Sequence, residues 1–355
     1  MKHLVMLGAG HAHLHLLSTL AAQPLAGVQI TLVAPYQQPL YVGMLPGFVA
    51  GHHTVQDCVI PLERFANNPA VTWLQRHAVN LDAVARTVTL DDGSTHTFDV
   101  LSINPGPMLD KQKTEQMMPG AREHALFALP LEPFGALWPK VLELARQKPL
   151  RFAVIGGGAT GFELACAVAH RLPASSVTLL SGDAAVGTNY PAAVQSMMLQ
   201  ALKARAITVI QERVVGIGAG EVTLASGARL ASDVPIIATG AQAPEWLGNS
   251  GLALDTQGFV AVDVYQRSVS HPQVFVAGDG DTRVDLNLSL IKNLRAVLAG
   301  IEPSPCAPQA KTLNFLACGN QRAIASWGNW SAQGRWVVWL KDWSDRRFIK
   351  AYSRG

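Results

Sequence analysis

The fold is decided by the stretch RFAVIGGGATGFE at residues 151–163. Its first five residues are mostly apolar without alternation, which is typical of a strand buried on both faces of a parallel sheet. Gly156, Gly158 and Gly161 then follow the G-x-G-x-x-G spacing and lead into a helix-like run over 159–171. Free N–H groups at the start of such a helix point at a pyrophosphate, and glycines leave room for its approach. The stretch therefore predicts a dinucleotide-binding turn.

The same unit occurs at the start of the chain. Residues 2–7 read as a buried strand, Gly8 and Gly10 form the turn, and residues 11–22 continue as a helix. His13 stands where the third glycine would be. A further apolar strand follows each copy; these strands are residues 28–33 and 177–180. Strand, turn, helix and strand form a right-handed βαβ unit, so the sequence predicts an α/β protein with two Rossmann-like domains.

Composition excludes several classes of protein. The 355 residues are 49% hydrophobic and 15% charged, so the chain can bury enough apolar surface to offset its ordering entropy, and disorder is excluded. Four scattered cysteines without a C-x-x-C pair argue against a disulfide-stapled scaffold and a zinc site. The net charge of +3 is concentrated in residues 335–355, which hold six Lys or Arg and two Asp. A broad basic face for nucleic acid is therefore not expected.

The beginning of the chain bears on where the protein works. Because residues 2–7 read as a buried strand, we expect no signal peptide ahead of the fold. No stretch approaches the ~18 uninterrupted apolar residues of a membrane span. We expect a cytoplasmic protein that is at most peripheral on the inner face of the membrane. The sequence leaves the oligomeric state open.

Three further segments complete the predicted topology. Residues 87–94 and 221–227 read as hairpins at equivalent places in the two halves, the first with an Asp-Gly turn. Residues 273–279 read as a late buried strand that ends in Gly-Asp. Because this strand has no partner in the second unit, we expect it to rejoin the first sheet.

In this order, the motifs resemble the pyridine nucleotide-disulfide oxidoreductase superfamily. The motifs are Gly8-Ala9-Gly10, Gly156 to Glu163, Ala238-Thr239-Gly240 and Val274 to Asp279. The segment PLYVGMLPGFVAG at residues 39–51 is similar to the Leu-Pro segment beside the flavin in type II NADH dehydrogenases. With GAGHAH at residues 8–13, the resemblance is closer still to the NADH dehydrogenase-like flavoprotein found fused to selenide, water dikinase.

The resemblance implies an FAD domain that is interrupted by an NAD(P)H domain, with a short C-terminal segment. The FAD domain would consist of residues 1–125 and 251–303, the NAD(P)H domain of residues 126–250, and the C-terminal segment of residues 304–355. FAD and NADH are the cofactors it implies, and NADPH stays open. A selenium-linked role is also suggested by the fused relatives, although no residue here would bind selenium specifically.

The resemblance also implies roles for individual residues. Glu163 would lie near the nicotinamide amide, Pro46 would line the isoalloxazine ring, and Asp279 would accept a hydrogen bond from the ribityl chain. Val79 would meet the adenine through its backbone. The cofactor-binding residues it implies are Gly8, Gly10, His11, Val79, Gly106, Gly278, Asp279, Gly156, Gly158, Gly161, Asp183, Thr239 and Gly240. No metal site is expected, because only His11 and His15 would share a helix face while His13 points elsewhere.

The choice of nicotinamide cofactor depends on the end of the strand at 177–180. An acid there usually holds the adenosine ribose 2′-OH of NADH. The sequence has Ser181-Gly182, with Asp183 just after, so the acid is displaced. No arginine adjoins Ser181 to clamp the 2′-phosphate of NADPH. We therefore favour NADH.

Missing cysteines narrow the expected activity. The resembled disulfide reductases carry a cysteine pair against the flavin, where this chain has residues 40–51 without cysteine and Cys58 alone. Sulfide:quinone oxidoreductases also need cysteines, and the intact motif at 156–163 argues against that branch. The expected function is an FAD-dependent NAD(P)H dehydrogenase that passes hydride to the flavin and electrons to a quinone-like acceptor. The alternative is a nucleotide-binding or redox-sensing flavoprotein with little turnover, which the short stretch between Asp279 and Asn293 favours.

The basic C-terminal segment contains five of the eight tryptophans, from Trp327 onward. On a helix, one stripe would consist of Trp336, Trp339, Leu340 and Trp343. Tryptophan with basic residues suits an interfacial membrane helix, and the resembled type II enzymes attach to membranes through this region. The alternative is a strand over 335–340 and a short helix capped by Ser344, with the aromatics packed on the flavin domain. Because Arg347 and Lys350 continue the stripe, we favour the packed segment.

Overall fold

The computed structural model describes residues 1–66, 68–277, 284–306 and 312–353. A five-stranded sheet, parallel throughout, forms the centre of the first unit. Its order is β16 (Val274–Val276), β7 (Val100–Ile103), β1 (Lys2–Leu7), β2 (Val28–Val33) and β3 (Val71–Leu74). Because β16 pairs with β7, the late strand rejoins the first sheet as predicted.

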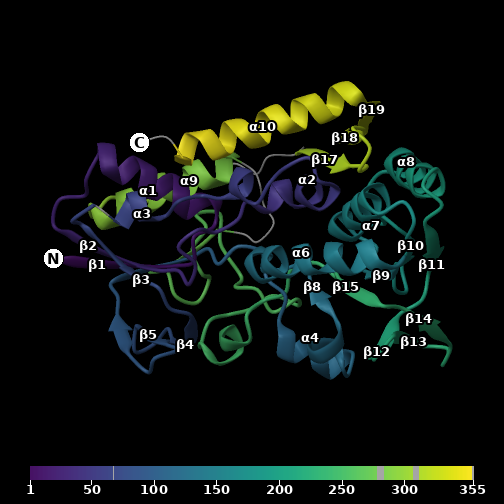
Figure 1. The fold of residues 1–355 in the computed structure, drawn as a ribbon. Helices are drawn as coiled ribbons and strands as arrows, with labels where there is room; N and C mark the ends of the chain where they lie inside the picture. The colour runs from purple at the N-terminus through teal and green to yellow at the C-terminus, as the bar shows by residue number, and fades with distance from the viewer. Residues whose placement is uncertain (67, 278–283, 307–311, 354–355) are drawn as a thin grey trace.

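A second five-stranded parallel sheet lies between β7 and β16 in the sequence. Its order is β11 (Thr208–Ile210), β10 (Ser176–Leu180), β9 (Arg151–Ile155), β15 (Val234–Ile237) and β8 (Leu126–Phe127). The two sheets occupy separate halves of the molecule (Figure 1). The predicted fold class, two Rossmann-like units with one interrupting the other, is confirmed.

Helices cover the sheets and begin where the glycine turns end. In the first unit, α1 (His11–Ala22) has Gly10 as its N-cap and packs against α9 (Val284–Leu298). In the second unit, α7 (Ala159–Arg171) has Gly158 as its N-cap. The other helices beside the sheets are α3 (Glu63–Ala66), α6 (Leu131–Gln147) and α8 (Ala192–Lys203). The predicted runs 11–22 and 159–171 are therefore helices with those bounds.

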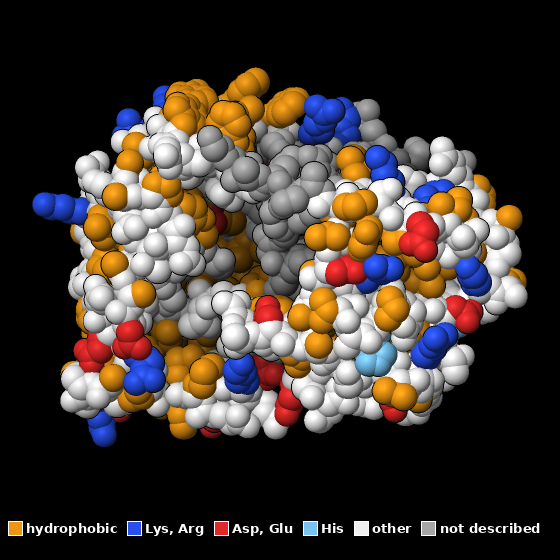
Figure 2. Space-filling model, turned by 180° about the vertical axis from the view of Figure 1, so that it is seen from behind, with side chains coloured by type: hydrophobic (Ala, Val, Ile, Leu, Met, Phe, Trp, Pro, Cys, Tyr) orange, Lys and Arg blue, Asp and Glu red, His pale blue; other side chains and the backbone are white. Residues whose placement is uncertain are grey.

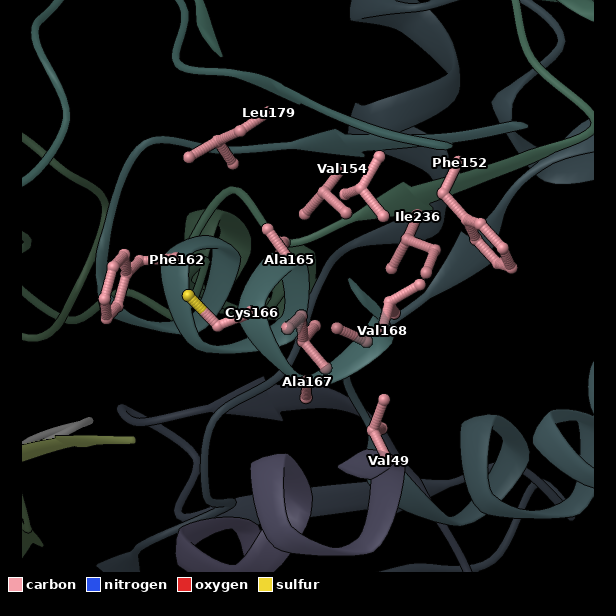
Figure 3. Packing of buried hydrophobic residues seen from close by; sticks show 14 of the residues in the cluster. Val49, Phe152, Val154, Phe162, Ala165, Cys166, Ala167, Val168, Leu179 and Ile236 are labelled. Atoms are coloured by element: carbon pink, nitrogen blue, oxygen red, sulfur yellow. The ribbon is translucent and has the colours of Figure 1, made fainter. Parts of the chain in front are cut away.

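The two units are joined by a shared core around α7. Figure 3 shows side chains of α7 between the strands of the second sheet and Val49, which belongs to α2 (Leu45–Ala50) of the first unit. The α7 residues in this core are Phe162, Ala165, Cys166, Ala167 and Val168, and the strand residues are Phe152, Val154, Leu179 and Ile236. Because α2 packs directly on α7, the segment predicted to lie beside the flavin is fixed against the helix of the second glycine turn.

Smaller antiparallel sheets complete the fold, together with two short helices, α4 (Lys111–Met117) and α5 (Ala121–His124). The first sheet has β4 (Ala78–Asp82), β5 (Thr87–Leu90) and β6 (Thr95–Thr97), and the second has β12 (Val214–Gly218), β13 (Glu221–Leu224) and β14 (Arg229–Ala231). The third has β17 (Leu313–Ala317), β18 (Ala323–Trp327) and β19 (Trp330–Gly334). Both predicted hairpins are present, as β5–β6 and β13–β14.

The C-terminal segment differs from the sequence expectation. Residues Arg335–Ser353 form one long helix, α10, so the strand predicted over 335–340 and the short helix capped by Ser344 are wrong. The helix starts directly after β19, and no glycine or proline interrupts it. It lies across the top of the molecule, over α1, α2 and α9 (Figure 1). None of the described helices is both long and apolar enough to cross a membrane.

Candidate functional site

The first glycine turn lies between β1 and α1, against the end of β7. Gly8 has a φ of +89°, and a Cβ there would collide with the carbonyl oxygen of Asn104 and with Pro105. Backbone hydrogen bonds fix the turn, because the Gly8 N–H donates to Val33 (2.8 Å) and the Gly10 N–H to the Asn104 carbonyl (3.0 Å). Both the conformation and the space at Gly8 thus require glycine.

His13 occupies the position of the missing third glycine and hydrogen-bonds to the turn. Its buried imidazole lies 2.7 Å from the Gly8 carbonyl oxygen through Nδ1, and 2.7 Å from the Ser102 hydroxyl through Nε2. A carbonyl only accepts, so Nδ1–H donates to Gly8 and Nε2 accepts from Ser102. Burial lowers the pKa of His13 to about 4, which keeps the ring neutral in this arrangement. His13 therefore braces the turn from inside.

The second turn, between β9 and α7, has the full glycine set. Gly156 has a φ of +135°, and a Cβ there would collide with the Ala238 carbonyl oxygen. A Cβ on Gly161 would collide with the carbonyl oxygen of Gly156, so helix and strand approach each other as closely as glycine permits. A Cβ on Gly158 would meet no atom within 4 Å. The open side of this turn leaves room for a phosphate at the start of α7.

Two oppositely charged side chains, Asp183 after β10 and Arg213 after β11, lie close together. Asp183 Oδ2 lies 3.8 Å from Arg213 Nε, and both side chains are exposed. The Gln211 side-chain amide also donates to the Asp183 carbonyl (3.0 Å). Sequence reasoning missed Arg213, because it precedes β12 and no signal near Ser181 points to it. Arg213 could meet a 2′-phosphate, so the argument from a missing arginine no longer favours NADH.

The remaining predicted cofactor-binding residues lie at strand ends of the two units. Thr239 and Gly240 are exposed and follow β15, beside the second turn, and Gly106 follows β7 at the matching place beside the first. Val79 lies in β4 with a half-exposed side chain. Gly278 and Asp279 lie outside the described residues.

The His11 ring belongs to an aromatic cluster under α10. Its centroid lies 5.3 Å from that of Tyr41 and 4.7 Å from that of Phe348, and the rings of Tyr41 and Phe348 are stacked at 4.5 Å. Burial lowers the pKa of His11 to about 4. His15 meets Tyr352 of the same helix. His11 and His15 therefore face α10 together, while His13 points the other way, as the helical spacing predicts.

Pro46 is buried in the first turn of α2. The segment before it is anchored at its start, because the Leu40 N–H donates to Glu132 Oε1 (2.9 Å) and the Tyr41 N–H donates to the Cys58 carbonyl (2.8 Å). No cysteine lies in this segment, and Cys58 is buried, with its thiol directed at the Thr54 carbonyl (3.4 Å). Burial raises the pKa of Cys58 to about 12, which disfavours the reactive thiolate.

Glu163 reaches from α7 to the C-terminal sheet. Its Oε1 accepts a hydrogen bond from the Ala317 N–H at 2.7 Å, at the end of β17. Burial raises the pKa of Glu163 to about 7, although the Lys341 ammonium and the bond from Ala317 oppose that rise. The raised pKa would allow Glu163 to hold or release a proton near neutral pH.

A buried ion pair on α10 ties this helix to the Leu-Pro segment. Lys341 Nζ lies 2.6 Å from Asp345 Oδ2 and donates to the Gly43 carbonyl at 2.5 Å. The Tyr41 hydroxyl donates to the other carboxylate oxygen of Asp345 at 3.2 Å. Burial raises the pKa of Asp345, and Lys341 opposes that rise. Sequence reasoning missed this pair, because only the i, i+4 spacing on a continuous helix would have indicated it.

His52 and His53 follow α2 and turn in different directions. His52 Nε2 lies 2.8 Å from the Gly319 carbonyl oxygen, and its ring is 5.1 Å from that of His170. His53 Nε2 lies 3.4 Å from Asp342 of α10. Burial lowers the pKa of His53, and Asp342 opposes this. Both residues thus link α2 to its neighbours.

Comparison with known proteins identifies the family. The family model described as pyridine nucleotide-disulphide oxidoreductase matches residues 2–292. The chain therefore belongs to this family of oxidoreductases, whose cofactors are FAD and NAD(P)H.

Individual relatives agree with this assignment. The NADH dehydrogenase-like protein MT1860 of Mycobacterium tuberculosis is 28% identical over 239 residues, which are 62% of this chain and 58% of that protein. Among solved structures, the sulfide:quinone oxidoreductase of Aquifex aeolicus has a TM-score of 0.76 at 17% identity and covers 99% of this chain and 91% of its own. NDH2 of Plasmodium falciparum in complex with NADH has a TM-score of 0.75 at 13% identity, covering 99% and 97%. These two structures show likeness of fold alone.

The described residues fit the cofactors of the family. Each turn places the start of a helix of twelve or more residues at the end of a parallel strand, and the space above Gly158 is open. At the first turn, the buried Oδ1 of Asn104 has no hydrogen-bond partner among the residues that the structure describes. Figure 2 shows a hollow near the middle of one face, with hydrophobic side chains visible inside it. Gly8, Gly10 and Gly106 would hold FAD, and Gly156, Gly158 and Gly161 would hold NAD(P)H.

Proposed function

We propose that this protein is an FAD-dependent NAD(P)H dehydrogenase that passes electrons to a small quinone-like acceptor. The observation that carries the proposal is the packing of α2 on α7, which joins the Leu-Pro segment to the helix that bears Glu163. FAD in the first unit would supply the two-electron chemistry. The protein itself would hold the nicotinamide nucleotide at Gly156, Gly158 and Gly161, and hold a proton on Glu163.

The proposed route uses no protein thiol. All four cysteines are free and buried; they are Cys58, Cys166, Cys306 and Cys318. Burial raises the pKa of each thiol, to about 12 for Cys58 and about 11 for Cys318. Thiols of this kind are poor nucleophiles and poor redox partners. The acceptor would therefore take electrons from the flavin directly.

The proposed domain division is the one that the resemblance implies: FAD-binding segments at 1–125 and 251–303 around an NAD(P)H-binding domain at 126–250, with a C-terminal segment at 304–355. Either nicotinamide nucleotide fits the end of β10, where Asp183 could take a ribose 2′-OH and Arg213 a 2′-phosphate. Anaerobic titration with NADH tests the proposal, because the number of electrons taken up per flavin separates a thiol-free enzyme from a disulfide reductase. A flavoprotein that only senses nucleotides would bind NADH without rapid bleaching.

We also propose that α10 attaches the protein peripherally to an anionic membrane. Its inner face is buried against the protein and consists of Val337, Lys341, Asp345, Phe348 and Tyr352. Its outer face carries Trp336, Trp339 and Trp343, which are 52%, 70% and 48% exposed. The expectation that these aromatic residues pack on the flavin domain is therefore wrong. A helix at a water-facing surface usually buries its apolar residues and exposes its charged ones. Here the Lys341–Asp345 ion pair faces the protein and the tryptophans face outward, which is the reverse.

Basic residues accompany these tryptophans. Arg347 lies over the Trp343 ring at 5.3 Å, and the exposed basic residues of the helix are Arg335, Arg346, Arg347 and Lys350. The neighbouring β18–β19 turn adds Trp327 and Trp330, both about half exposed. Hydrophobic and basic side chains gather at the top of Figure 2, where Figure 1 places α10. Interfacial tryptophan with Lys and Arg favours an anionic lipid surface.

Co-sedimentation with vesicles tests the attachment. The protein should sediment with phosphatidylglycerol vesicles at low salt, and high salt should release it, since each basic residue contributes about 1 kcal/mol near such a surface. The W336S/W339S/W343S variant should bind about tenfold or more weakly while it keeps its flavin. L137S/L144S is the control, because it removes two exposed leucines from α6 instead. No sedimentation of the wild type at low salt, or equal loss in the control, would contradict the proposal.

A further inference from the structure

The two glycine turns can be compared position by position, because the strands beside them pair in the same register. Ile103 of β7 pairs with Leu7 of β1, just as Ile237 of β15 pairs with Ile155 of β9. The next residues are Asn104 and Ala238. Their carbonyl oxygens take the same place, since each would collide with a Cβ on the first glycine of its turn. Asn104 and Ala238 are therefore structural equivalents, with a polar side chain in one unit and a methyl group in the other.

This difference changes the space beside the second glycine of each turn. At Gly10, a Cβ would collide with the side-chain carboxamide of Asn104. At Gly158, the same test finds no atom within 4 Å. The Asn104 side chain therefore forms a wall of the first turn that the second turn lacks.

No hydrogen bond in the described part of the chain shows that the Asn104 carboxamide stabilises the fold. Asn104 is only 7% exposed, and its Oδ1 has no hydrogen-bond partner among the described residues. The N–H groups of Gly8 and Gly10 have backbone partners, and the Gly8 carbonyl accepts from His13, so none of these groups uses the carboxamide. A buried amide oxygen without a hydrogen-bond partner lowers the stability of the fold. The second unit has Ala238 at the equivalent position, so the turn itself does not need a polar side chain there. An unpaired polar group in such a place is explained if a bound molecule completes its hydrogen bonding.

We infer that the Asn104 side chain is a hydrogen-bonding contact for the FAD held at the first turn, and that it distinguishes this site from the NAD(P)H site. A carboxamide offers an acceptor and two donors, which suit the hydroxyl groups and phosphate oxygens that a dinucleotide carries side by side. A methyl group at Ala238 leaves the second turn without this contact, as suits a nucleotide that must exchange during turnover. The inference rests on the proposed use of FAD.

Equilibrium binding of FAD to the full-length protein stripped of flavin tests this inference. Asn104→Ala should weaken FAD binding about tenfold, because it removes hydrogen bonds to the cofactor. Asn104→Asp keeps the shape but places a carboxylate near the phosphates, and should weaken binding on the order of a hundredfold. NAD⁺ binding, measured separately, should stay unchanged in both variants. Thermal unfolding of the flavin-free protein should be no lower for Asn104→Ala than for the wild type, because the lost group had no partner.

The outcomes separate this inference from the function on which it rests. A wild-type protein that does not bind FAD would overturn the proposed function. Wild-type binding with equal affinity in Asn104→Ala and Asn104→Asp would overturn only the role of Asn104. A drop in the melting temperature of flavin-free Asn104→Ala, in proportion to its loss of FAD, would show a structural residue and would also overturn it. Ala238→Ser is the matched control, because it alters the equivalent place in the second unit and should leave FAD affinity unchanged.

Discussion

Gly10→Val is expected to give a folded protein that purifies without FAD. The backbone at Gly10 has a φ of −66°, which any residue can adopt, so the effect does not come from strain. It comes from space, because a Cβ there would already collide with the Asn104 carboxamide. A branched side chain would also fill the approach to the start of α1, where the pyrophosphate is held. Affinity for FAD should fall on the order of a hundredfold or more, as measured by flavin absorbance and by FAD titration.

The outcome that contradicts this assignment is a yellow Gly10→Val protein with one FAD per chain. Circular dichroism shows whether the variant is folded, so that a collapsed protein is not mistaken for a specific loss. The matched control is valine at the equivalent glycine of the second unit, which should leave the yellow colour intact.

Gly158→Val should strongly slow the reduction of the flavin by NADH while FAD stays bound. Here φ is −79° and a Cβ would meet no atom within 4 Å, so the fold accommodates the side chain without rearrangement. The valine methyl groups would occupy the open space at the start of α7, where the second pyrophosphate approaches. Under stopped-flow conditions, the bleaching rate at low NADH should fall on the order of a hundredfold. Loss of FAD from this variant, or bleaching at the wild-type rate, would show that the two turns do not divide the cofactors as proposed.

The elements around both turns could be predicted from the sequence because their signals are local. Uniform apolar runs gave the strands, and Gly8, Gly10, Gly156 and Gly158 marked where each helix starts. The late strand could also be placed, since a buried run without a partner in one sheet must pair in the other. Strands of a parallel sheet are apolar throughout and follow one another through short βαβ connections, and both features can be read from the sequence.

Other features could not be predicted because they depend on contacts between distant residues. The usual amphipathic pattern fails for α10, which turns Lys341 and Asp345 inward and its tryptophans outward. Asn104 looks like an ordinary residue at a strand end until its packing against Gly10 is seen. Arg213 meets Asp183 only because β10 and β11 pair. In each case the decisive information is tertiary.

Anaerobic titration of the purified protein with NADH tests the central claim most directly. NADH carries two electrons and FAD accepts two, so an enzyme without a redox-active cysteine pair should bleach completely with about one equivalent of NADH per flavin. The reduced protein should then reduce a quinone analogue stoichiometrically, and its four cysteines should stay unmodified throughout. Uptake of about two equivalents per flavin, with a long-wavelength absorption band before full bleaching, would reveal a dithiol in the pathway and contradict the account.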